Sequence, residues 1–143
     1  MKILGHPVHL KLLHFPAALF PMEGLLYGVL VFTQDSNFAF ASFCILVGGV
    51  SLGWVAAVFG ALDMASISSE REGVIKKALL HGAINGTILV AYTVITYLLY
   101  MSYPVLPEGN IIMLGVKLFL VLLLVVGNFI GGNLVLKDKV GLS

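Results

Sequence analysis

The sequence predicts an all-α membrane protein, folded as a single up-and-down bundle of four transmembrane helices over residues 1–143. Hydrophobic residues make up 59% of the chain and charged residues only 10%, and the mean hydropathy is +1.06. A typical soluble domain is about 25% charged. Because so few charged side chains cannot cover a soluble surface, most of the outer surface must face lipid, and the lipid bilayer is the first expected partner.

Four apolar stretches of 21 to 26 residues supply the spans, and they extend over residues 12–32, 38–62, 78–100 and 111–136. At about 1.5 Å per residue, each can cross a hydrocarbon layer about 30 Å thick. Backbone polar groups have no water to bond in lipid, so each span must be a helix. The first contains two prolines and Glu23 and precedes three more spans, which favours a retained helix over a cleavable signal.

Three connecting segments, residues 33–37, 63–77 and 101–110, have the polar, glycine and proline composition of turns. Seven of the eight Lys and Arg residues lie in the N-terminus, the middle segment and the C-terminus, and the other two segments contain none. The positive-inside rule therefore predicts that both termini lie in the cytoplasm.

Several functional classes are excluded by composition. A net charge of +1 offers no basic stripe for nucleic acid. The single cysteine, Cys44, excludes a disulfide framework and a cysteine-ligated metal cluster. Neither a nucleophile–base pair nor a phosphate loop is visible, so we do not expect an enzyme that acts on its own.

Small residues recur at helical spacing in three of the spans, which is typical of helices that pack closely in lipid. They are Gly49, Gly53, Ala56 and Gly60 in the second span, Gly82 and Gly86 in the third, and Gly127 and Gly131 in the fourth. Tight packing alone is the simpler interpretation, and room for a flat cofactor is the alternative.

All four histidines belong to the predicted cytoplasmic half of the bundle. His14 and His81 each follow a Leu-Leu pair near the start of the first and third spans. Ionisable groups at membrane depth are costly and indicate a functional site by default. If the two spans lie diagonally at matched depth, the two imidazoles suit the opposite faces of one haem iron, as in a b-type cytochrome.

The expected haem site includes second-sphere and rim residues. Asn85 or Asp63 would accept the other imidazole N–H, a contact that fixes the ligand tautomer. Lys11 and Lys77, together with other basic residues of the rim, would suit the haem propionates. The alternative is that His81 and Asn85 simply bond between helices.

His6 and His9 offer a second possibility, since histidines three residues apart can share a metal ion. A transition-metal site here would be histidine-rich, formed from His6, His9, His14 and His81. The simpler interpretation of His6 and His9 is a polar segment lying at the lipid headgroups.

Glu23 and Lys117 are charged residues inside the first and fourth spans. Glu23 lies nine residues beyond His14, so it points to about the opposite side of its helix and is not part of the histidine site. We predict that Glu23 and Lys117 form a structural ion pair, with outward snorkelling of Lys117 as the alternative.

The sequence resembles the bacterial membrane-protein family known as domain of unknown function 2231. Members typically open with Gly-His-Pro-x-His-Pro leading into Val-His-Phe-Pro. The matching positions are residues 5–19 (GHPVHLKLLHFPAAL), residues 60–63 (GALD), His81 with Asn85, and residues 131–135 (GGNLV). The resemblance implies a four-span protein without an assigned activity, and some members are joined to a Rieske-type iron–sulfur domain, which implies electron transfer nearby.

Two departures from the family pattern shift the expected site. Leu10 stands where relatives usually have proline, and Asp138 stands near a position where many have histidine. The second departure removes a candidate ligand and favours His14 and His81. We therefore expect a small electron-transfer subunit that binds haem b within a membrane redox complex. The alternatives are a non-haem accessory or scaffold subunit with structural histidines, and a histidine-rich metal-binding protein.

Overall fold

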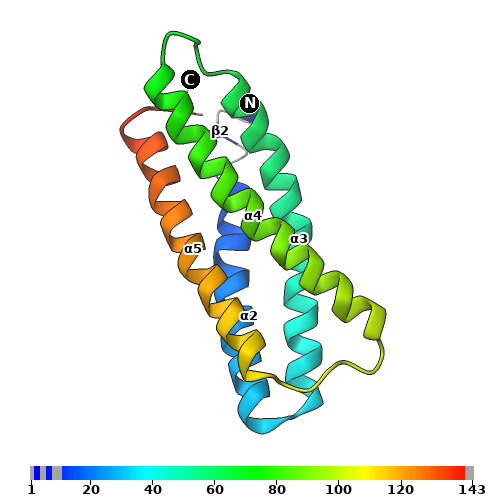
Figure 1. The fold of residues 1–143 in the computed structure, drawn as a ribbon. Helices are drawn as coiled ribbons and strands as arrows, with labels where there is room; N and C mark the ends of the chain where they lie inside the picture. Colours follow the sequence, from blue (N-terminus) through cyan, green and yellow to red (C-terminus); the bar gives the residue numbers. More distant parts are fainter. Residues whose placement is uncertain (1, 4–5, 8–10, 141–143) are drawn as a thin grey trace.

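The structure is a computed structural model that describes residues 2–3, 6–7 and 11–140. Four long helices alternate in direction along the bundle: α2 (His14–Thr33), α3 (Ser36–Ala65), α4 (Glu72–Ser102) and α5 (Ile111–Leu136), as Figure 1 shows. Each of the four is long and apolar enough to cross a membrane. The predicted all-α bundle with four spans is confirmed.

Two helices are longer than their predicted spans. α3 has 30 residues and α4 has 31, because both continue into polar sequence at the end of the bundle where the chain termini lie. α4 begins at Glu72, six residues before the predicted start, since the charged residues of this segment are good helix formers outside lipid. At the other end, side chains cap the helices: Asp35 accepts from the Asn37 backbone N–H at 2.8 Å.

A short antiparallel pairing near the N-terminus was not predicted. It joins β1 (Lys2–Ile3) to β2 (His6–Pro7), with Lys2 opposite Pro7 and Ile3 opposite His6. Two residues per strand are too few to show the period-2 pattern from which strands are recognised.

The helices form a ring in which each packs against its chain neighbours and α5 closes on α2. α2 and α4 therefore lie diagonally, as expected for the first and third spans. Across this diagonal, the rings of Phe20 and Tyr92 stack with their centroids 4.1 Å apart and an interplanar angle of 10°. Both side chains are almost fully buried, so this stack fills the centre of the bundle.

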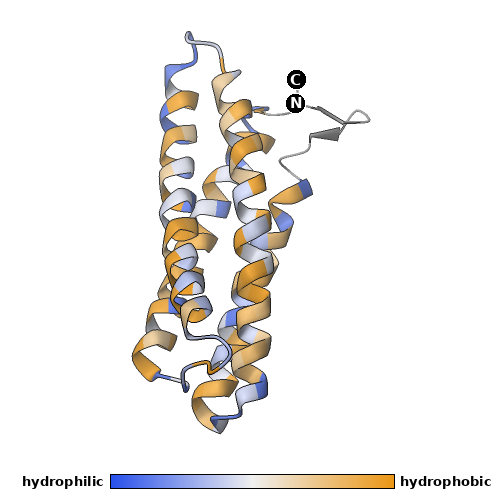
Figure 2. Ribbon diagram, turned by 90° about the vertical axis from the view of Figure 1, so that its right-hand side faces the viewer, coloured by the Kyte–Doolittle hydropathy of each residue, from blue (hydrophilic) through white to orange (hydrophobic). Residues whose placement is uncertain are grey.

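Apolar residues occur along most of the length of the helices, as the orange bands of Figure 2 show. Large side chains such as Leu25, Leu122 and Phe129 have exposed fractions of 65% or more. Such a surface would be an aggregation hazard in water but is the ordinary boundary of a helix bundle in lipid.

The glycines at helical spacing lie in two different surroundings, some against neighbouring helices and some in open space. A Cβ added at Gly49 or Gly53 would come within 2.8 Å of the Phe20 ring or 2.7 Å of a Leu89 methyl, so these glycines allow close packing as predicted. Gly82 and Gly86 on α4 have nothing within 4 Å of an added Cβ. Their face of α4 points away from the other helices.

The segment between α4 and α5 is fastened to the end of α2. The Gln34 side-chain amide donates to the Gly109 carbonyl at 3.0 Å, and the Gly109 N–H donates back to the Gln34 Oε1 at 2.9 Å. A Cβ at Gly109 would lie 2.6 Å from the Val31 Cα, so only glycine fits this approach. The Tyr27 hydroxyl also accepts from the Asn110 N–H at 3.1 Å, which fixes where α5 begins.

Candidate functional site

Polar side chains at membrane depth gather in two groups. The first, which we call the histidine cluster, consists of His81 and Asn85 on α4 against α5. The second, which we call the ion-pair cluster, consists of Glu23, Ser42, Tyr27 and Lys117, contributed by α2, α3 and α5. The stacked rings of Phe20 and Tyr92 belong to the apolar core between these helices.

In the histidine cluster, the His81 ring is held by the backbone of α5. Its Nδ1 lies 2.8 Å from the Gly127 carbonyl oxygen and 3.1 Å from the Asn85 side-chain nitrogen. Because a carbonyl oxygen can only accept, the hydrogen bond to Gly127 needs a hydrogen on Nδ1. The Asn85 side-chain amide donates to the His81 backbone carbonyl at 3.0 Å.

Two glycines of α5 make space for this arrangement. A Cβ added at Gly131 would lie 2.6 Å from the His81 Cε1, and one added at Gly127 would lie 2.6 Å from the Asn85 amide nitrogen. The glycine pair predicted in the fourth span therefore lies against the side chains of the histidine cluster. The His81 ring consequently faces α5 rather than α2.

His14 lies elsewhere. Its side chain is exposed at the start of α2, where it lines an open surface hollow together with Lys11, Phe15 and two further α2 residues. The structure does not bring the imidazoles of His14 and His81 together, and the diagonal between α2 and α4 is occupied deeper in the bundle by the stacked aromatic rings. Paired ligation of one iron would need the exposed His14 side chain to turn inward.

The other residues expected at the haem site are Asp63, Lys77 and Lys11. Asp63 is buried at the end of α3 with a 6% exposed fraction, and its backbone carbonyl accepts from the Ser66 hydroxyl at 2.6 Å. Lys77 pairs with Asp138 at 3.0 Å. Lys11 is exposed beside His14 rather than beside Lys77.

The second candidate metal pair is not tested by the structure. The His6 backbone lies in β2, its side chain is not described, and His9 lies outside the described residues. Within residues 11–140, three or more His, Cys, Asp or Glu side chains nowhere form a group able to hold a metal ion.

The ion-pair cluster confirms the predicted contact between Glu23 and Lys117. The Lys117 ammonium donates to the Glu23 Oε1 across the interface of α2 and α5, and both residues have an exposed fraction of 0%. The ammonium also lies 4.2 Å from the centroid of the Tyr27 ring. Lys117 is thus held inside the bundle and does not snorkel outward.

Ser42 completes this cluster and was not predicted. Its hydroxyl donates to the same Glu23 oxygen at 2.6 Å. One sequence signal pointed to it, because Ser42 is the only hydroxyl-bearing residue between Phe38 and Val50. The other carboxylate oxygen of Glu23, Oε2, is buried without a hydrogen-bond partner in the described structure. A half-satisfied buried charge makes the cluster sensitive to loss of either partner.

These features define a small four-span membrane protein with a buried intramembrane ion pair and a histidine bonded between helices. The family model described as predicted membrane protein (DUF2231) matches residues 5–143, so the chain belongs to this family. No curated protein matches the sequence, and no solved structure matches the fold.

Proposed function

We propose that the protein is an accessory or scaffold subunit of a larger complex in the bacterial inner membrane, with both termini in the cytoplasm. The observation that carries this proposal is the outward face of α4. Gly82 and Gly86, four residues apart, have open space where a side chain would stand. The other glycine pairs of the bundle receive side chains of neighbouring helices.

A small-residue pair at this spacing lets a second helix approach closely in lipid, where packing rather than a hydrophobic driving force holds helices together. Val90 and Val94 continue the same face along α4 and are half exposed. Gly82, Gly86, Val90 and Val94 therefore form an exposed strip of small apolar residues along α4, which suits packing against a transmembrane helix of another subunit.

The proposal is tested with Gly86→Leu, which fills the strip without touching the bundle core. In native membranes solubilised gently, we expect the wild-type protein to migrate with a mass well above one chain, and the variant to migrate nearer to one chain. Gly115→Leu is the matched control, because Gly115 is also open to lipid but has no small residue four positions away. Equal migration of all three proteins would contradict the proposal.

The inside orientation of the termini rests on the asymmetry of basic residues between the two ends of the bundle. Labelling of intact spheroplasts with a membrane-impermeant thiol reagent tests it, in a Cys44→Ser background. We expect labelling of Ser36→Cys, at the start of α3, and protection of Ser69→Cys, between α3 and α4. The reverse pattern would invert the orientation.

An electron-transfer subunit with haem b is the second candidate, and the hydrogen bond of His81 favours it. Ligating histidines usually donate their other ring N–H to a carbonyl or carboxylate, as Nδ1 of His81 does to Gly127. His14 would have to turn inward to become the second axial ligand. In this role the protein would pass electrons between other redox subunits.

A visible spectrum of the protein purified from haem-replete cells tests this second candidate. Bis-histidine haem gives a Soret band with sharp α and β bands on reduction, and both His14→Ala and His81→Ala should abolish it. Asn133→Ala, a change elsewhere in the same half of the bundle, should retain the spectrum. A colourless, folded, metal-free protein would refute the haem role, and the accessory role would then be the remaining proposal.

A further inference from the structure

The start of α2 carries a surface hollow that none of the preceding functions uses. It has a volume of about 470 Å³ and is lined by Lys11, His14, Phe15, Ala18 and Leu19. Leu19 separates it from the bundle interior, because the Leu19 Cβ packs 3.4 Å from the position of a Cβ at Gly49 on α3. The hollow therefore opens outward, where lipid surrounds the helix.

Its polar and apolar walls are separated along the helix axis. Lys11 and His14 are three residues apart, and Leu13 between them has helical backbone angles, so their side chains lie on one face. Both are exposed. Phe15, Ala18 and Leu19 follow as α2 runs into the bundle, so the hollow is polar at the end of the bundle and apolar further along the span.

The charges around this hollow have one sign. Among the side chains that the structure describes, Lys11 and His14 are its only ionisable lining residues, and no carboxylate lines it. A second hollow at the same end, at the start of α4, is lined by Glu70 and Glu72 as well as Arg71 and Lys77. Arg71 already donates to the Asp138 backbone carbonyl at 2.6 Å. Lys77 is already paired with Asp138 there. Of the two, the hollow on α2 is the one that suits an anion.

We propose that this hollow binds an anionic phospholipid. The phosphate accepts hydrogen bonds from the Lys11 ammonium and from an imidazole N–H of His14, and one acyl chain lies over Phe15, Ala18 and Leu19. The occupant is a phospholipid because the hollow faces the bilayer, and an anionic one because its polar end carries only donors. This site is independent of the accessory role and competes with the use of His14 as a haem ligand.

Native mass spectrometry of the purified full chain tests the proposal, with phosphatidylglycerol or phosphatidylcholine added at equal concentration. We expect one tightly retained phosphatidylglycerol per chain and weaker retention of phosphatidylcholine. Since a basic residue near anionic lipid contributes about 1 kcal/mol, Lys11→Gln should weaken binding about fivefold. The double variant Lys11→Gln/His14→Gln should weaken it further.

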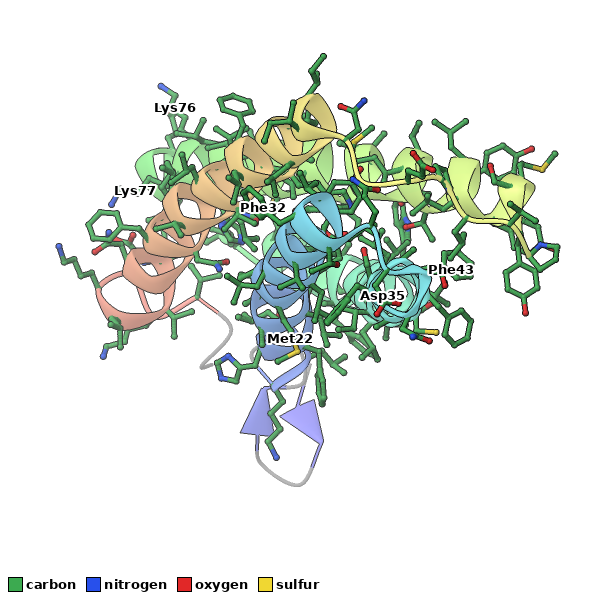
Figure 3. All side chains as sticks on the ribbon, turned by 90° about the horizontal axis from the view of Figure 1, so that it is seen from below. Met22, Phe32, Asp35, Phe43, Lys76 and Lys77 are labelled. Carbon is green, nitrogen blue, oxygen red and sulfur yellow. The ribbon has the colours of Figure 1, made fainter. Side chains whose placement is uncertain are left out.

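Two matched pairs of variants distinguish a specific lipid site from general attraction of basic residues to an anionic membrane surface. Lys76→Gln removes an exposed basic residue from the same end of the bundle; Figure 3 shows Lys76 projecting outward from α4. Ala18→Trp fills the hollow, and Ala57→Trp adds the same ring to the exposed side of α3. Only Lys11→Gln and Ala18→Trp should reduce retention of phosphatidylglycerol.

Three results would overturn the proposal. They are equal retention of the two phospholipids, an equal loss on Lys76→Gln and Lys11→Gln, and a haem bound through His14 in the purified protein. Ala18→Trp leaves the charges unchanged, so it also tests the site if the charge variants fold poorly. Failure of the accessory role would appear separately, as a single-chain mass insensitive to Gly86→Leu.

Discussion

Breaking the buried contact between Glu23 and Lys117 should be among the most destabilising single changes in the bundle. Substituting Glu23 and substituting Lys117 should lower the unfolding free energy by different amounts. Removing one partner of a buried ion pair typically costs about 3–5 kcal/mol of unfolding free energy. In Glu23→Gln, the Lys117 ammonium keeps the Tyr27 ring at 4.2 Å, which offsets about 2 kcal/mol when desolvated. We therefore place this variant near the lower end, at about 3 kcal/mol.

Lys117→Met should be worse. It leaves the Glu23 carboxylate with a single donor, the Ser42 hydroxyl, and with its second oxygen still unpartnered. Because an uncompensated buried anion has little else to bond here, we expect a loss near the upper end, about 5 kcal/mol. The double variant Glu23→Gln/Lys117→Met has no buried charge and should recover most of the lost stability.

Unfolding by sodium dodecyl sulfate in mixed micelles gives the free energies. The single tryptophan is a convenient reporter, because the Trp54 indole N–H donates to the Thr93 hydroxyl at 3.0 Å and so monitors the contact of α3 with α4. Glu108→Gln, on an exposed loop, is the matched control for loss of a carboxylate and should change stability by less than about 0.5 kcal/mol.

The double-mutant cycle decides whether the pair acts as a unit. If the two single losses simply add in the double variant, the ion pair contributes no coupling and the interpretation of the cluster is wrong. If Glu23→Gln costs more than Lys117→Met, the aromatic ring does not stabilise the ammonium, and the predicted asymmetry is refuted.

Three further changes probe the packing by the same unfolding measurement. Gly131→Ala places a Cβ 2.6 Å from the His81 ring and should lower the unfolding free energy by about 1–3 kcal/mol. The control Gly132→Ala meets open space and should lower it much less, so equal losses would refute the close approach. Gly109→Ala should cost a similar amount, about 1–3 kcal/mol, because its Cβ meets the backbone of α2, and a neutral result would show that the loop is not fastened there. Phe20→Ala removes the ring stacked on Tyr92 and should cost about 3–5 kcal/mol; a loss below about 1 kcal/mol would show that the stack is not part of the core.

The family to which the chain belongs does not by itself assign a function to the fold. Membership connects the chain to a set of membrane proteins without an assigned activity, so function must be argued from the site rather than from the fold. The accessory role depends on Gly82 and Gly86, whereas the haem role and the phospholipid site both use His14 and exclude each other. Gly86, His81 and Lys11 carry these three proposals, and each has its own measurement.

Much of the fold could be predicted because the bilayer restricts the alternatives. Long apolar stretches in lipid must be helices, so the predicted span over residues 111–136 coincides with α5, and the ends of the other three predicted spans lie within six residues of the helix ends. The pairing of Glu23 with Lys117 was predictable for a related reason. Two opposite charges in the spans of a small bundle are too costly to leave apart.

The direction in which each side chain points was decided only by tertiary packing. Matching positions in the chain suggested that His14 and His81 face one gap, but α5 presents Gly127 and Gly131 beside His81, and the ring turns to the space they leave. Depth in the membrane follows from sequence position along a helix. Rotation about the helix axis depends on which neighbouring helix offers a glycine or a carbonyl, and that information exists only once the helices have packed.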